Sequence, residues 1–152
     1  MIKKLLFRWL PALIVMVLIF FLSAMPGKSV AVSTNPITKP LAIVEHKSSL
    51  FSGLSPIPWL KVGHFVGYSV LGLTLFRGFS LSGLDNEFYP TIISFLYACS
   101  DELHQNFVAG RSGSFSDVLL DTSAAFIAVL LFVYLRQTAK LIFHQEAFKK
   151  SE

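Results

Sequence analysis

Charged residues are scarce in this sequence. Asp, Glu, Lys and Arg make up 14% of its 152 residues, whereas 53% are hydrophobic, and the mean hydropathy is +0.62. Soluble globular domains carry about 25% charged residues. This composition excludes a soluble domain of this size and predicts an integral membrane protein.

Cysteine is almost absent. Cys99 is the single cysteine and lies in an apolar run, which excludes a disulfide framework within the chain and a cysteine-based metal site. Basic residues outnumber acidic ones by 13 to 9, but they cluster at the termini and form no stripe with stacking aromatics. The cations therefore indicate topology and contact with anionic lipids, and no nucleic-acid partner is expected.

Four apolar runs predict an all-α fold, a membrane bundle of four transmembrane helices. The first lies in residues 1–25 and is read as a retained helix, with a cleaved signal peptide as the alternative. Residues 26–60 hold five of the seven prolines and predict an external loop, in which residues 41–54 form either a short surface helix or no regular structure. The remaining runs lie in a three-helix core at 61–138, which a basic tail at 139–152 follows.

The distribution of Lys and Arg predicts that both termini lie in the cytoplasm. In this arrangement eight of these residues lie on the inner side and five on the outer side, which is the direction that the positive-inside tendency requires. The predicted location is a bacterial cytoplasmic (inner) membrane, which the chain crosses several times.

Ionisable residues are concentrated in residues 100–121, between two apolar runs. Such residues are costly inside a bilayer and usually functional. At 1.5 Å of helical rise per residue, His64, Asp101 and Asp121 each lie about 20–22 Å from the inner boundary of an apolar core about 30 Å thick. All three are therefore expected at one level, in the outer third of the membrane.

Helical spacing places further polar residues beside these three. Together they predict an outward-facing polar pocket. The residues that join it are Lys61, Tyr68, Glu102, Gln105, Arg111 and Asp117. Small residues at helical spacing predict close packing between helices. These are Gly63 and Gly67, in a G-x-x-x-G motif, and Ala124 with Ala128.

Two segments resemble the VanZ-like family of small bacterial membrane proteins. They are K-V-G-H-F-V-G-Y-S-V-L-G at 61–72 and D-E-L-H-Q-N-F-V-A-G-R-S-G-S-F-S-D-V-L-L-D at 101–121. The resemblance covers about residues 60–130 and implies functional positions at Lys61, His64, Tyr68, Asp101, Glu102, Gln105, Gly110, Arg111 and Asp117. It also implies a link to low-level resistance to the glycopeptide teicoplanin. The family usually has Asn where this chain has Asp121, and glycines where it has Ala124 and Ala128.

The pocket residues suggest two kinds of role. His64, Asp101 and Glu102 are the candidate catalytic, acid–base set, and the two acids could instead bind a cation or form salt bridges that hold the bundle. The candidate substrate-binding residues are Lys61, Tyr68, Gln105, Arg111 and Asp117. His104 is nearer the water and is expected to be an ordinary exposed residue.

Three functions are compatible with these residues. The first is binding or processing of an envelope-lipid headgroup at the outer leaflet, for example that of a polyprenyl-phosphate-linked intermediate. The second is a non-enzymatic accessory role in the envelope through partner contacts. The third is proton-coupled transport, for which intramembrane acids are typical.

The predicted pocket has an imbalance of charge. Four carboxylates face two cations, Lys61 and Arg111, and carboxylates this close in a low dielectric do not all stay ionised. Mg²⁺, Mn²⁺ or Zn²⁺ would suit oxygen and imidazole ligands, but no spacing here is a recognised metal motif. We therefore expect no metal or other cofactor and predict shared protons, in which case Asp121→Asn should be tolerated.

Overall fold

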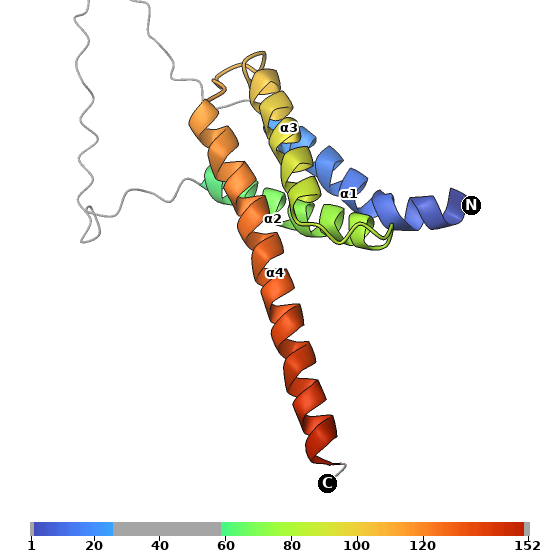
Figure 1. The fold of residues 1–152 in the computed structure, drawn as a ribbon. Coiled ribbons are helices and arrows are strands. Elements are labelled where there is room, and N and C mark those ends of the chain that lie inside the picture. The colour runs from blue at the N-terminus through green and yellow to red at the C-terminus, as the bar shows by residue number, and fades with distance from the viewer. Residues whose placement is uncertain (1, 26–58, 151–152) are drawn as a thin grey trace, which may run out of the picture.

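The computed structural model describes residues 2–25 and 59–150, and the regular structure in these ranges consists of four helices (Figure 1). These are α1 (Ile2–Ser23), α2 (Trp59–Ser80), α3 (Phe88–Gln105) and α4 (Phe115–Lys149). The prediction of an all-α fold is confirmed. The proline-rich loop, including the surface helix considered for residues 41–54, lies outside the described residues.

Local chemistry determines where helices begin and bend. The Asn86 Oδ1 accepts a hydrogen bond of 2.7 Å from the backbone N–H of Phe88, which satisfies one of the free donors at the start of α3. Pro11 lies inside α1 and has no N–H to donate to the carbonyl of Phe7, four residues earlier. Arg77 of α2 donates to that carbonyl instead, at 3.1 Å, so the proline creates a docking point between the two helices.

Successive helices run in opposite directions. At one end, Ser23 of α1 lies against Asp101 of α3, and His64 of α2 lies against Asp121 of α4. His64 also lies near Ser23 and Asp101, so the C-terminal ends of α1 and α3 meet the N-terminal ends of α2 and α4. The other end holds Arg77, which also stacks over the Phe7 ring at 4.5 Å, and we call it the Arg77 end.

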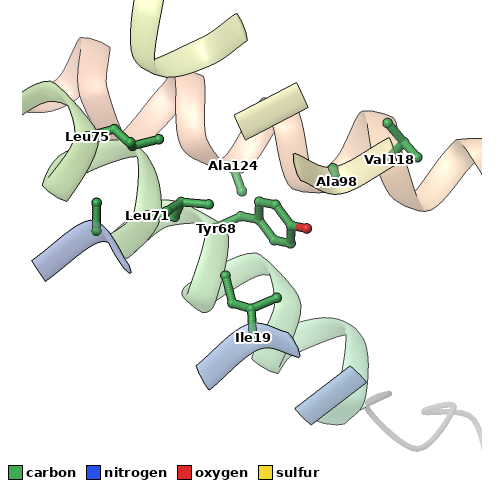
Figure 2. Packing of buried hydrophobic residues seen from close by; sticks show 8 residues of the cluster. Ile19, Tyr68, Leu71, Leu75, Ala98, Val118 and Ala124 are labelled. Atoms are coloured by element: carbon green, nitrogen blue, oxygen red, sulfur yellow. The ribbon is translucent and has the colours of Figure 1, made fainter. Parts of the chain in front are cut away.

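The apolar core lies between the four helices. Tyr68 and Leu71 of α2 are fully buried, and Ala98 of α3 and Ala124 of α4 pack in the same cluster. Figure 2 shows the Tyr68 side chain extending from α2 into this cluster. Large side chains of α2 thus fill the space that small residues leave on α3 and α4.

Glycine and alanine set the distance between α2 and α4. A Cβ atom at Gly72 would come within 2.8 Å of the Ala125 carbonyl oxygen, so the two helices cross in direct backbone contact. The predicted G-x-x-x-G contact is different. Gly67 faces the Ile19 side chain of α1, whereas Gly63 has no described atom close to its Cβ position. The predicted close packing is therefore found at Gly67, against α1, whereas no described residue approaches Gly63 closely.

Of the four described helices, two are long and apolar enough to cross a membrane, over Lys3–Ser23 in α1 and Phe115–Ala147 in α4. Their outer faces are apolar and exposed, with Phe21 at 63% and Leu131 at 56%. Large contiguous apolar surfaces are rare on soluble monomers, which agrees with a membrane protein. α4 continues without a break beyond Arg136 to Lys149, so the predicted fourth span and the tail as far as Lys149 form one helix that extends past the bundle (Figure 1).

Candidate ligand pocket

A cavity of about 370 Å³ lies at the end of the bundle opposite Arg77. Its volume is within the usual range for small-molecule sites. We call it the pocket. Its lining residues come from α2, α3, α4 and the loop at 106–114, and they are Lys61, His64, Glu102, Gln105, Gly110, Arg111, Ser112, Asp117, Leu120 and Asp121.

His64 of α2 contacts residues of the three other helices. Its Nδ1 lies 3.2 Å from Asp121 Oδ2 and 3.8 Å from Asp101 Oδ2, and its Nε2 lies 3.5 Å from Ser23 Oγ. The predicted common level of His64, Asp101 and Asp121 is confirmed by these contacts. Since helical rise is constant, residues at equal distance from one boundary meet when the helices pack side by side.

Asp101 is buried beside the pocket. Ser23 Oγ donates a hydrogen bond of 2.8 Å to its Oδ2, and Gln105 Nε2 donates to the same oxygen at 3.3 Å. Only 3% of Asp101 is exposed, and it is not among the lining residues of the pocket within the described part of the chain. The carboxylate therefore contacts a ligand only through its neighbours, above all His64 and Gln105.

Glu102 is held in place from both sides and also lines the pocket. Gln105 Nε2 donates to its Oε1 at 3.0 Å, and the backbone N–H of Ser114 donates to its Oε2 at 2.8 Å. The loop approaches so closely that a Cβ at Gly113 would collide with the Glu102 carbonyl oxygen. Gly110 has a φ of +74°, a conformation that favours glycine. The two glycines thus allow the loop to bring its N–H group to Glu102.

Lys61 and Asp117 form an ion pair at the entrance to the pocket, with 2.6 Å between Nζ and Oδ1. The lysine side chain is 54% exposed, and two of its three N–H donors remain available to a ligand.

Arg111 joins the loop to the end of α1. Its Nε donates to the Met25 carbonyl at 2.9 Å, its Nη2 to the Leu22 carbonyl at 3.2 Å, and its Nη1 to Gln105 Oε1 at 3.5 Å. The guanidinium thereby satisfies the Leu22 carbonyl, which the last turn of α1 leaves free, and the Met25 carbonyl just beyond the helix. Two of its five N–H groups have no partner among the described residues and are available to a ligand in the pocket.

Two predicted positions differ from the structure. Tyr68 has no exposed surface and stacks beneath His64 with 6.2 Å between ring centroids, so it lies in the core and not in the pocket wall. His104 is half-buried and stacks on Phe20 at 4.6 Å, so the expectation of an exposed residue is wrong. Helical spacing placed both side chains on the correct helix but could not show which neighbouring helix covers them.

Sequence reasoning missed the contribution of α1. Ser23 is completely buried and donates to Asp101, and the Leu22 and Met25 carbonyls anchor Arg111. A serine at the end of an apolar run is a weak sequence signal for a contact with the pocket. Backbone acceptors give no sequence signal at all, because every residue has a carbonyl group.

Comparison with known proteins identifies one relationship. The sequence profile described as VanZ/LLP1 matches residues 7–137, which includes the pocket and all but the start of α1. Searches of curated proteins and of solved structures find no match.

Proposed function

We propose, from the premise that the chain belongs to the VanZ/LLP1 family, that this membrane protein binds the phosphate-bearing headgroup of an envelope lipid in its pocket. The lipid class is that of polyprenyl-phosphate-linked intermediates. In this proposal all four helices cross the cytoplasmic membrane, both termini are cytoplasmic and the pocket faces the outer leaflet.

The apolar surface of the bundle supports the membrane setting. α1 and α4 meet the length and hydropathy that a membrane span requires. Exposed apolar residues also occur on α2 and α3, such as Val66 at 54% and Leu96 at 57%. Since α2 packs against α1 and α4, and α3 packs against α4, we propose that they cross the same layer. A lipid could then reach the pocket with its chain along the outer face of the bundle.

The available donors of the pocket support an anionic headgroup. Lys61 offers N–H groups that its ion pair with Asp117 does not use, and Arg111 offers two from a guanidinium that the end of α1 holds still. A fixed guanidinium suits the oxygens of a phosphate, because its planar N–H groups pair with two of them at once. Leu120, which also lines the pocket, offers an apolar contact for the first carbons of the chain.

Of the three acid–base residues, two line the pocket and the third lies behind them. Glu102 and His64 line the pocket and could exchange a proton with a headgroup, whereas Asp101 orients them through Gln105 and through its contact with His64. No alcohol or thiol nucleophile next to a base supports covalent catalysis among the lining residues of the described chain. Headgroup binding is therefore the function we propose, and proton transfer by Glu102 and His64 is the chemistry that a reaction there would use.

One observation carries this proposal: a single cavity of ligand size contains the N–H groups of Lys61 and Arg111 that are unpaired among the described residues, together with the apolar side chain of Leu120. Titration of the protein in lipid nanodiscs with undecaprenyl phosphate and with undecaprenol tests it, since the two ligands differ only in the phosphate. We expect the phosphate to bind at least about 10-fold more tightly, corresponding to about 1.4 kcal/mol. Arg111→Gln should reduce this preference, and Arg136→Gln at the Arg77 end should not. Equal affinity for both lipids would refute the proposal.

A further inference from the structure

Three potential metal ligands from three helices converge in the pocket. They are His64 of α2, Glu102 of α3 and Asp121 of α4, and one ligand atom from each lies within 4.8 Å of the other two. We propose that these side chains bind one divalent metal cation. The site stands on these residues alone and does not depend on the lipid proposed above.

Unpaired oxygens point to a missing partner. Asp121 is 1% exposed and lines the pocket, yet its Oδ1 has no hydrogen-bond partner among the described residues. The same holds for Oδ1 of Asp101, which lies beside it. Buried carboxylate oxygens nearly always have a partner. A cation between His64, Glu102 and Asp121 would provide one for Asp121.

The surroundings of the three ligands favour a metal. Gln105 and the Ser114 N–H already orient both oxygens of Glu102, and each oxygen keeps a second lone pair for a cation. Ser23 donates its proton to Asp101, so its oxygen can accept one from His64 Nε2, at 3.5 Å. With the proton on Nε2, the Nδ1 lone pair faces Asp121. Metal-binding histidines are commonly fixed in this way by a partner on the other ring nitrogen.

The charges around this cluster also favour a divalent cation. Asp117 is paired with Lys61. Among the described residues this leaves three carboxylates, of Asp101, Glu102 and Asp121, near one further cation, Arg111. If all are ionised, the difference is two negative charges in a place that is largely removed from water. A divalent cation offsets both charges, whereas the alternative requires protons on the carboxylates or on His64.

The chemistry of the ligands selects the metal. One imidazole and two carboxylates suit Zn²⁺ or Mn²⁺ better than Ca²⁺, which takes six to eight oxygen ligands. Three protein ligands leave at least one coordination position for water or a ligand oxygen. Since the three side chains line the pocket, that position would be accessible from the cavity.

Metal content and thermal stability test the site without any lipid. The protein is purified in detergent, stripped with EDTA and then titrated with Zn²⁺, Mn²⁺, Mg²⁺ or Ca²⁺. We expect about one equivalent of Zn²⁺ or Mn²⁺ per chain by elemental analysis after gel filtration, together with a higher melting temperature, because a ligand that binds only the folded state stabilises it. Mg²⁺ and Ca²⁺ should have weaker effects.

Variants separate this site from adventitious binding. Asp121→Asn and Glu102→Gln preserve side-chain size and should each weaken binding at least about 10-fold, with helix content checked by circular dichroism. His104→Gln and Asp85→Asn lie outside the cluster and should bind as the wild type does. Equal binding by all four variants would overturn the proposal.

The shared-proton alternative has its own signature. In that case the wild type shows no cation-dependent shift in melting temperature, and Asp121→Asn melts at a higher temperature than the wild type in EDTA, because the repulsion between carboxylates is relieved. This result would also overturn the metal site. Cation binding without a preference for undecaprenyl phosphate over undecaprenol would support the metal site and refute the proposed lipid function, so the two proposals can fail separately.

Discussion

Replacement of Ser23 by Ala should destabilise the protein, although this residue lies at the end of an apolar helix and far in sequence from the other pocket residues. The Ser23 hydroxyl is fully buried and donates a hydrogen bond of 2.8 Å to Asp101. Hydrogen bonds to charged groups contribute about 1.5–3 kcal/mol, and Gln105 continues to donate to the same oxygen at 3.3 Å. We therefore expect a loss near the lower limit, about 2 kcal/mol.

Thermal unfolding in detergent, followed by circular dichroism, measures this effect. For a chain of this length, a loss of about 2 kcal/mol corresponds to a decrease of roughly 4–8 °C in melting temperature. Ser100→Ala is the matched control, because the Ser100 hydroxyl is exposed and, among the described residues, donates only to the Tyr97 carbonyl in its own helix. An equal melting temperature for Ser23→Ala and Ser100→Ala would refute the stabilising role of the Ser23 hydroxyl.

A double-mutant cycle assigns the effect to the pair. If Ser23 acts through Asp101, then Ser23→Ala combined with Asp101→Asn should lose less stability than the sum of the two single changes. Asn is chosen because it preserves the size of this buried side chain, whereas Glu would add a methylene and disturb the packing whatever the role of Asp101. Additive losses would show that the hydroxyl stabilises α1 independently of Asp101.

Three further predictions test packing, the loop and topology. Gly72→Ala should reduce the free energy of unfolding by about 1–3 kcal/mol and so lower the melting temperature, because the added Cβ would meet the backbone of α4 at 2.8 Å. An unchanged melting temperature would contradict the close crossing of α2 and α4. Gly113→Ala should weaken ligand or metal binding in the pocket more than it changes helix content, because the loop must move away from the Glu102 carbonyl oxygen. In an otherwise cysteine-free chain in intact cells, a membrane-impermeant thiol reagent should label a cysteine at position Ser112 but not one at Ser82, and the reverse result would invert the proposed topology.

The meeting of polar residues at one level was predictable because helix geometry is nearly constant. His64, Asp101 and Asp121 lie at similar distances from the inner ends of their expected helices, and the structure brings them within hydrogen-bonding range or close to it. The i+3 contact of Glu102 with Gln105 follows from the same geometry. These features depend only on rise and turn per residue.

Features that depend on the packing of one helix against another were not predictable in the same way. Tyr68 shares a face with His64, but side chains of the neighbouring helices cover it completely. Gly63 and Gly67 have the spacing of a packing motif, yet the close crossing occurs at Gly72. Arg111 bonds to two carbonyls at the end of α1, and backbone acceptors leave no mark in a sequence.

The pairing of charges was only partly predictable. The predicted surplus of negative charge remains in the structure, and the structure adds that Lys61 compensates Asp117 in particular. This pairing isolates the buried acids around His64, which is the basis for the proposed cation. Sequence alone could count these charges but could not pair them.

Site-specific photocrosslinking tests the central claim, headgroup binding in the pocket, most directly. A benzophenone amino acid is placed at Leu120, which lines the pocket, or at Leu135, which is 56% exposed on the same helix toward the Arg77 end. Each protein is irradiated in nanodiscs with a trace of ³²P-labelled undecaprenyl phosphate. We predict strong labelling from Leu120, weak labelling from Leu135, and a loss of the Leu120 signal when Lys61 and Arg111 are both changed to Gln. Equal labelling from the two positions, or a Leu120 signal that survives the loss of both cations, would contradict the account.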